Sequence, residues 1–330
     1  MKYIPYFIFL FVIPSITYSG ELEDRESIKR IVKNMFIKDN FDGLSKLSKK
    51  YLETQERTSS GLWKLTLFYA GVGEIVNGKI KDKNYWNKLE KKALKWVESQ
   101  PQSPSGYIAY AMILVERAWM YRGGGWARDV KKESWKPFYE QLEKAKNYLK
   151  DHYEIASTDP RWHETMIIIA RSEGWHKDSF ELLVNKSTKL FPYYYQLYFA
   201  AIDYLTPKWH GSKQEIEKFA QKSVNITKAH EKTGMYARVY WYASQTNYGA
   251  QLFTKSAVTW TRMSKAIDDV LDKYPDQWNI NNFAFFSCLA GDKQKAAKLL
   301  SQVEGAPIIQ VWRNVRFFKQ CKSWSEQHQS

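Results

Sequence analysis

An arginine- and glycine-rich segment is the strongest candidate binding site in the sequence. Guanidinium groups are planar donors for carboxylate or phosphate, and glycines expose backbone amides and permit left-handed backbone. The residues leave one alternative open: a glycine cap that ends a helix, with arginines paired to neighbouring acids or stacked on tryptophan. The predicted binding residues are Arg117, Trp119, Arg122, Gly123, Gly124, Gly125, Trp126 and Arg128.

The histidines do not have the spacing of metal ligands. His163-Glu164 begins like the helix of a zinc protease, but Ile167 stands one turn later, where a second imidazole is needed. We therefore expect no metal site and no cofactor. The sequence also lacks a Gly-x-Ser-x-Gly elbow, a Walker loop and a dinucleotide-binding fingerprint. These absences weaken the enzyme interpretation without excluding it.

Glu98-Ser99 superficially resembles the catalytic pair of exported lytic transglycosylases. Such an enzyme needs a buried, protonated glutamate in a saccharide cleft. Here Gln100 and Pro101 follow at once, and the Gly-Leu-Met-Gln-type segment of that family is missing. We therefore expect Glu98 to lie exposed at a helix end, without a catalytic role.

The first 19 residues have the pattern of a signal peptide. Lys2 precedes an apolar stretch over residues 4–13, which is too short to span a bilayer as a helix. Thr17 and Ser19 are small residues at the positions that signal peptidase reads before a cut at Gly20. The alternative is an anchor that is never cut. The pattern predicts export, to the periplasm or the medium, with no transmembrane segment after cleavage.

The charge and the cysteines bear on partners and on the compartment. Residues 20–330 hold 49 basic and 35 acidic residues. In an exported protein, this positive charge favours binding to anionic polymers, lipid headgroups or an acidic protein partner over binding to nucleic acid. A solvated lysine-rich surface explains the same excess. The only cysteines, Cys288 and Cys321, are expected to pair in an oxidising compartment. Two buried, reduced thiols are the alternative.

Helical periodicity runs through nearly the whole chain after residue 19, and the alternation typical of strands is hard to find. Pro160 opens one helix, Gly174 breaks it, and Pro192 begins the next unit 32 residues after the first. That spacing is close to the tetratricopeptide repeat of about 34 residues. The pattern returns after Pro275, but between Pro192 and Pro275 the register is lost, so one hairpin must be longer than the repeat. We predict an all-α, tetratricopeptide-like stack of helical hairpins with degenerate repeats (an α-solenoid), in which residues 20–100 form N-terminal helices and residues 101–330 the repeat domain.

Six segments between residues 62 and 324 are distinctive in combination: Glu116 to Gly125, Gly174-Trp175, Phe191 to Tyr194, Met235 to Trp241, Asn282 to Ala284 and Cys288 to Asp292. Through these segments the chain resembles an uncharacterised family of bacterial exported proteins, the domain of unknown function numbered 4034. The resemblance implies a tetratricopeptide-like fold, and the family has no established activity to transfer.

Two functions from different classes remain. The favoured one is a non-enzymatic scaffold that binds a protein or peptide in the groove that stacked hairpins create. The other is an envelope hydrolase or carbohydrate-acting enzyme with an unrecognised carboxylate site. A pocket with paired acids of raised pKa favours the enzyme, and an open groove favours the scaffold.

Overall fold

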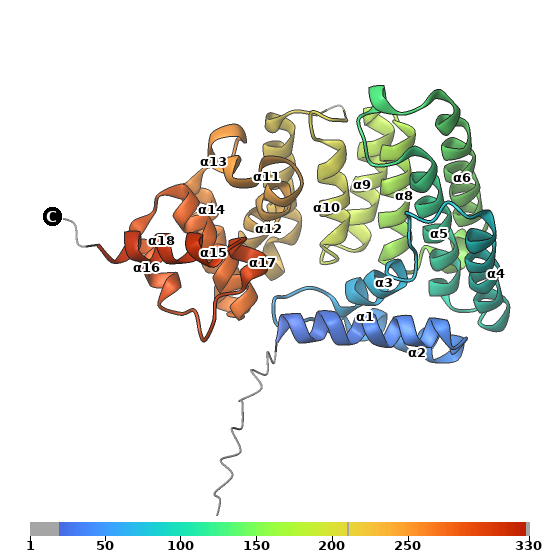
Figure 1. Cartoon of the computed structure of the whole chain (residues 1–330), viewed down its shortest axis with the longest axis horizontal. Coiled ribbons are helices and arrows are strands. Elements are labelled where there is room, and N and C mark those ends of the chain that lie inside the picture. Colours follow the sequence, from blue (N-terminus) through green and yellow to red (C-terminus); the bar gives the residue numbers. More distant parts are fainter. Residues whose placement is uncertain (1–19, 210, 328–330) are drawn as a thin grey trace, which may run out of the picture.

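A computed structural model of the chain describes residues 20–209 and 211–327 (Figure 1). Within these ranges the chain forms helices and turns, with an isolated bridge between Arg57 and Trp63 and no strand. The predicted all-α class is confirmed. The signal peptide predicted over residues 1–19 lies outside the described residues.

Local sequence signals set the ends of the helices where punctuation predicts them. At the start of α8 (Pro160–Glu173) the Asp159 carboxylate accepts a hydrogen bond of 2.8 Å from the Arg161 N–H, and Pro160 occupies the first helical position. The same helix ends at Gly174, whose φ of 68° is left-handed. The helix predicted between Pro160 and Gly174 is therefore confirmed.

Five consecutive hairpins stack side by side, and each packs mainly on its sequence neighbours. The first helices of the hairpins form one layer and the second helices cover it from outside. The first helices are α5 (Pro104–Arg122), α8, α10 (Gln196–Tyr204), α12 (Gly234–Ala243) and α15 (Gln277–Ala290). Their partners are α6 (Lys132–Asp151), α9 (Lys177–Leu190), α11 (Lys213–Glu231), α14 (Trp260–Lys273) and α16 (Lys293–Leu300). Before the first hairpin, α3 (Lys64–Gly73) and α4 (Lys83–Ser99) both pack on α5.

The two layers differ in how much of each helix is buried. In α6, the buried residues Phe138, Leu142, Ala145 and Leu149 recur at helical spacing, so a single stripe faces the core. In contrast, α5 is buried on most of its surface because it packs against α4, α6 and α8 at once. Most tryptophans and tyrosines fill the seams between helices, as expected for large rings in a repeat protein.

The N-terminal helices α1 (Glu21–Ile37) and α2 (Phe41–Thr54) lie along one edge of the stack (Figure 1). Helix α1 packs on α3 and reaches α15 near the other end of the array. The loop after α2 reaches the same region, because the Ser60 carbonyl accepts hydrogen bonds from Arg238 (3.1 Å) and Asn279 (3.2 Å). Helix α1 and the loop after α2 therefore contact helices of the repeat array directly.

The hairpin of α12 and α14 contains the extra residues that break the repeat register. Its two helices are separated by a π-helical turn and two further short helical segments, which confirms one hairpin longer than the repeat. The short elements of the fold are η1 (Ala127–Asp129), α7 (Tyr153–Ala156), η2 (Ser244–Tyr248), η3 (Gly249–Gln251), α13 (Leu252–Lys255) and α17 (Ile309–Trp312), and α18 (Val315–Glu326) is the last helix.

The two cysteines meet between α15 and α18. The structure joins Cys288 to Cys321 in a disulfide, with their Cα atoms 6.0 Å apart, a separation within the usual range for such bonds. Of the helices in residues 20–209 and 211–327, none combines the length and apolar character that crossing a membrane requires.

Candidate functional site

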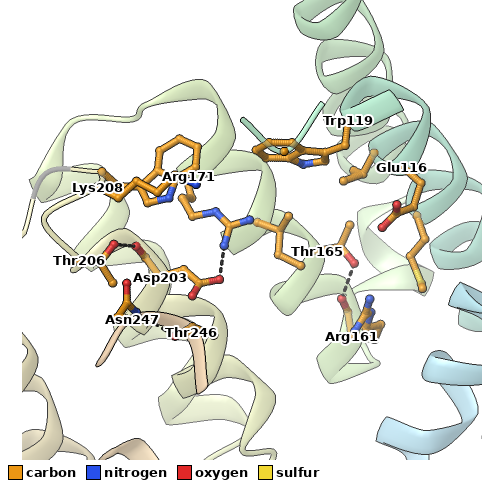
Figure 2. Close-up of a pocket in the computed structure, with 15 residues that line it drawn as sticks. Glu116, Trp119, Arg161, Thr165, Arg171, Asp203, Thr206, Lys208, Thr246 and Asn247 are labelled. Carbon is orange, nitrogen blue, oxygen red and sulfur yellow. Dashed lines mark hydrogen bonds and ion pairs between the residues drawn. The ribbon is translucent and has the colours of Figure 1, made fainter. Parts of the chain in front are cut away.

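A pocket of about 450 Å³ opens on the layer of first helices (Figure 2). Its walls come from α5, α8, the end of α10 with the loop that follows, and the π-helical turn after α12. These segments are distant in sequence and meet because successive hairpins stack. The pocket is lined by Met112, Val115, Glu116, Trp119, Gly124, Arg161, Thr165, Ile168, Arg171, Asp203, Thr206, Lys208, Trp209, Thr246 and Asn247.

One wall holds a charged pair that is satisfied within the protein. Arg171 of α8 forms an ion pair with Asp203 of α10, and Tyr242 donates a hydrogen bond of 3.2 Å to the same carboxylate. Burial raises the pKa of Asp203, although Arg171 opposes that shift. Both charges of this pair are therefore already neutralised by partners within the protein.

A second charged pair supports the pocket from below. Arg161 forms an ion pair of 2.5 Å with Glu164, which also accepts a hydrogen bond of 3.1 Å from Tyr194. Next to it, the Tyr69 hydroxyl donates to Asp159 over 2.5 Å, and burial raises the pKa of Asp159 to about 6. This network ties α3, α8 and the turn before α10 together, so it holds the base of the pocket rigid.

Two charged side chains of the pocket have no such partner. Within the described residues, neither Glu116 nor Lys208 forms an ion pair or hydrogen bond with another side chain. Lys208 lies 5.6 Å from the ring centre of Trp126. Glu116 is open to the pocket, yet the surrounding protein raises its pKa, with Arg161 opposing the shift. Figure 2 shows Glu116 and Lys208 on opposite sides of the pocket.

Aromatic rings form another part of the lining. Trp119 and Trp209 are half-buried, and their ring centres lie 6.3 Å apart at an interplanar angle of 82°. Trp119 also packs edge-on against Phe138 at 5.3 Å, which fixes its orientation. The pocket therefore offers a rigid apolar surface between its two unpaired charges.

The predicted arginine and glycine segment contributes only part of this site. Trp119 and Gly124 line the pocket, whereas Arg117 is buried toward α4. There Arg117 forms an ion pair with Glu90 and a hydrogen bond of 3.1 Å to Asn87. These contacts of Arg117 match the alternative to a binding site, in which the arginines of the segment pair with neighbouring acids.

Arg122 and Arg128 have different surroundings. The buried Arg122 lies 5.1 Å from the ring centres of both Trp119 and Trp135. It donates hydrogen bonds of 2.9 Å and 3.0 Å to the carbonyls of Gly123 and Gly125, so it holds the turn that ends α5.

Gly123 makes that turn possible through its φ of 73°. Arg128 is exposed near Asp129, and Trp126 is also exposed. Arg122 and Arg128 therefore have different partners, and a binding role for this segment stays a prediction.

A second, smaller pocket of about 220 Å³ lies beside the first. The two adjoin through the hydrogen bond between Asp203, which lines the first pocket, and Tyr242, which lines the second. Trp241 and Trp278 form its aromatic walls, and Arg25 of α1 lies 4.7 Å above the Trp278 ring. The N-terminal helix thus helps to build this surface.

Other candidates from the sequence are structural or exposed. His163 is buried and bonds Ser187 (3.1 Å) and the Ser157 carbonyl (3.2 Å), while Glu98 is exposed near the end of α4. Among the described residues, no group of three or more histidine, cysteine, aspartate or glutamate side chains is placed to hold a metal ion.

No protein-family model, curated protein or solved structure matches this chain. The resemblance to the exported bacterial family therefore stays a prediction.

Proposed function

We propose that the protein is an exported, non-enzymatic scaffold that binds an extended segment of a partner protein in the pocket between α5, α8 and α10. The observation that carries the proposal is a preformed pocket of about 450 Å³ with a mixed polar and apolar lining. Its volume falls in the range of ligand sites, and its walls are helices held by partly buried ion pairs. Such a site binds without first having to be ordered.

The lining suits a peptide chain. Asn247 is exposed at the rim, and a side-chain amide offers one acceptor and two donors that match the groups of a peptide bond. Trp119 and Trp209 supply flat apolar surface for the side chains of such a segment. The adjoining pocket at Trp241 lets the segment continue along the first helices.

Site-specific crosslinking in living cells tests this function. A photoreactive phenylalanine derivative at Asn247 lies at the rim of the pocket, and the same residue at the exposed Glu143 of α6 is the matched control. We expect Asn247 to give a discrete crosslinked protein that Glu143 does not give. Crosslinks of equal pattern from both positions would contradict a binding role for the pocket.

Fractionation of the same cells tests the export that the proposal assumes. We expect to find the protein in the envelope or the medium, with the mass of a chain that begins at Gly20. Full-length protein in the cytoplasm would contradict it.

A carbohydrate-acting enzyme is the second candidate, and one observation favours it: burial raises the pKa of both Glu116 and Asp203 in one pocket. A general acid of this kind needs a second, free carboxylate as base or nucleophile. Asp203 is already bound to Arg171 and Tyr242, which is why the scaffold is preferred. Hydrolysis of purified cell-wall glycan that disappears in Glu116→Gln and persists in Glu143→Gln would establish the enzyme instead.

A further inference from the structure

The charges around the pocket are separated into a negative end and a positive end. At one end lie Glu116, Arg161 and Glu164, whose formal charges leave an excess of one negative charge. At the other lie Lys208, Arg171 and Asp203, which leave an excess of one positive charge. Because each arginine is matched by its own acid, the excess at each end belongs to Glu116 and to Lys208.

These two charges face the pocket and are available to a ligand. Glu116 comes from the middle of α5 and Lys208 from the loop after α10, and Figure 2 shows them across the pocket from each other. Trp119 stands one helical turn after Glu116 on the same face of α5, so a cation that pairs with Glu116 can also lie against an indole ring. The Lys208 end offers an ammonium group with three donors to a carboxylate.

We infer that the pocket selects a segment of a partner protein that carries a basic side chain, seated between Glu116 and Trp119, and an acidic side chain a short distance along the chain, paired with Lys208. The inference rests on the proposed peptide-binding function and adds the chemistry and the polarity of the partner. It differs from the expectation drawn from net charge, because the basic excess of the whole chain favours acidic partners, whereas one of the two unpaired charges in the pocket is a carboxylate.

A positional-scanning library of hexapeptides with acetylated and amidated ends measures this selectivity directly, since blocked ends remove terminal charges. Purified residues 20–330 are expected to select Lys or Arg at one position and Asp or Glu at another. The consensus hexapeptide, labelled with a fluorophore, then gives dissociation constants by anisotropy.

Charge removal and charge reversal identify the residues responsible. Glu116→Gln should weaken the consensus peptide about ten-fold, the effect expected from the loss of one charged hydrogen bond in a partly buried site. It should leave unchanged a peptide whose basic residue is replaced by norleucine. Glu116→Lys should move the preference at that position to Asp or Glu, and Lys208→Glu should move the other preference to Lys or Arg. Because a folding defect cannot create a new preference, the reversed variants separate recognition from stability.

Glu143→Gln and Lys265→Gln are the matched controls, since both residues are exposed on second helices. They should bind the consensus peptide as the wild type does. If peptides bind without a basic preference, or if Glu116→Gln and Glu143→Gln weaken binding equally, the inference is wrong while the peptide-binding function stands. If no member of the library binds, both the function and the inference fail.

Discussion

Removal of the buried imidazole of His163 should change how stability depends on pH. Burial lowers the pKa of His163 to about 4 from an ordinary value of 6.5, and Lys186 adds to that effect. The ring is neutral in the folded protein at pH 7, and Ser187 and Ser157 hold it within the hairpin of α8 and α9. Protonation would place an uncompensated charge beside the rings of Trp162 and Phe191.

The sign and size of the effect follow from these two pKa values. The unfolded chain binds a proton near pH 6.5 and the folded protein only near pH 4, so His163 lowers stability progressively as the pH falls through this window. The full separation corresponds to roughly 3 kcal/mol, of which about 2 kcal/mol is lost by pH 5.

Urea unfolding of residues 20–330, followed by tryptophan fluorescence at pH 7.5 and pH 5, measures the effect. His163→Gln is less stable than the wild type at pH 7.5 because packing is lost, but its free energy of unfolding should fall about 2 kcal/mol less on acidification. His176→Gln, at an exposed position, is the matched control and should follow the wild type. Equal losses in His163→Gln and the wild type would refute the argument that a buried neutral imidazole opposes acid.

Three other predictions concern separate parts of the fold. Burial raises the pKa of Asp159 from 3.8 to about 6, so the folded protein loses stability as the pH rises through that window. Asp159→Asn should therefore gain roughly 2.4 kcal/mol relative to the wild type between pH 4 and pH 7 in the same urea assay. Replacement of Cys321 by Ser should cost about 3–4 kcal/mol in the chain-entropy model and speed amide exchange in α18, whereas two free thiols in the intact mass of native protein would disprove the bond. Arg122→Lys should lower the melting temperature by several degrees, since it loses stacking on two tryptophans worth roughly 1–2 kcal/mol, while Arg128→Lys should not. Unaltered capture of the crosslinked partner by both folded variants would show that neither arginine takes part in binding.

The helical hairpins were predictable because their signals are local. Pro160, Gly174 and Gly291 mark helix ends through backbone preferences that do not depend on distant residues, and the apolar stripe of a helix such as α6 has a period that shows in any short window. The position of α1 across the array was not predictable, since it depends on contacts such as Arg25 on Trp278, 253 residues apart in the chain.

The pocket could be predicted only in part, for the same physical reason. Trp119 and Gly124 lie within the segment that the sequence singles out, but Arg171, Asp203 and Asn247 join them only through the stacking of four hairpins. Glu116 immediately precedes that segment, and a helical projection places it on the same face as Trp119, so the signal for it was present. The charge and spacing of the neighbouring arginines instead predict an anion site, at which a carboxylate such as Glu116 is not expected.

A charged side chain can bind a ligand only where no partner within the protein already neutralises it, and this explains why an arginine-rich segment does not by itself make an anion site. Arg117 and Arg171 are each matched by an acid on a neighbouring helix, and Arg122 is occupied by carbonyls and rings, so these three guanidinium groups hold the fold together. What remains for a ligand is set by the residues left unmatched, Glu116 and Lys208, and neither differs in type from many surface residues of the chain. Composition therefore predicts the electrostatic field far from the protein, which is basic, while the pairing of side chains across stacked helices determines which charge a bound segment meets.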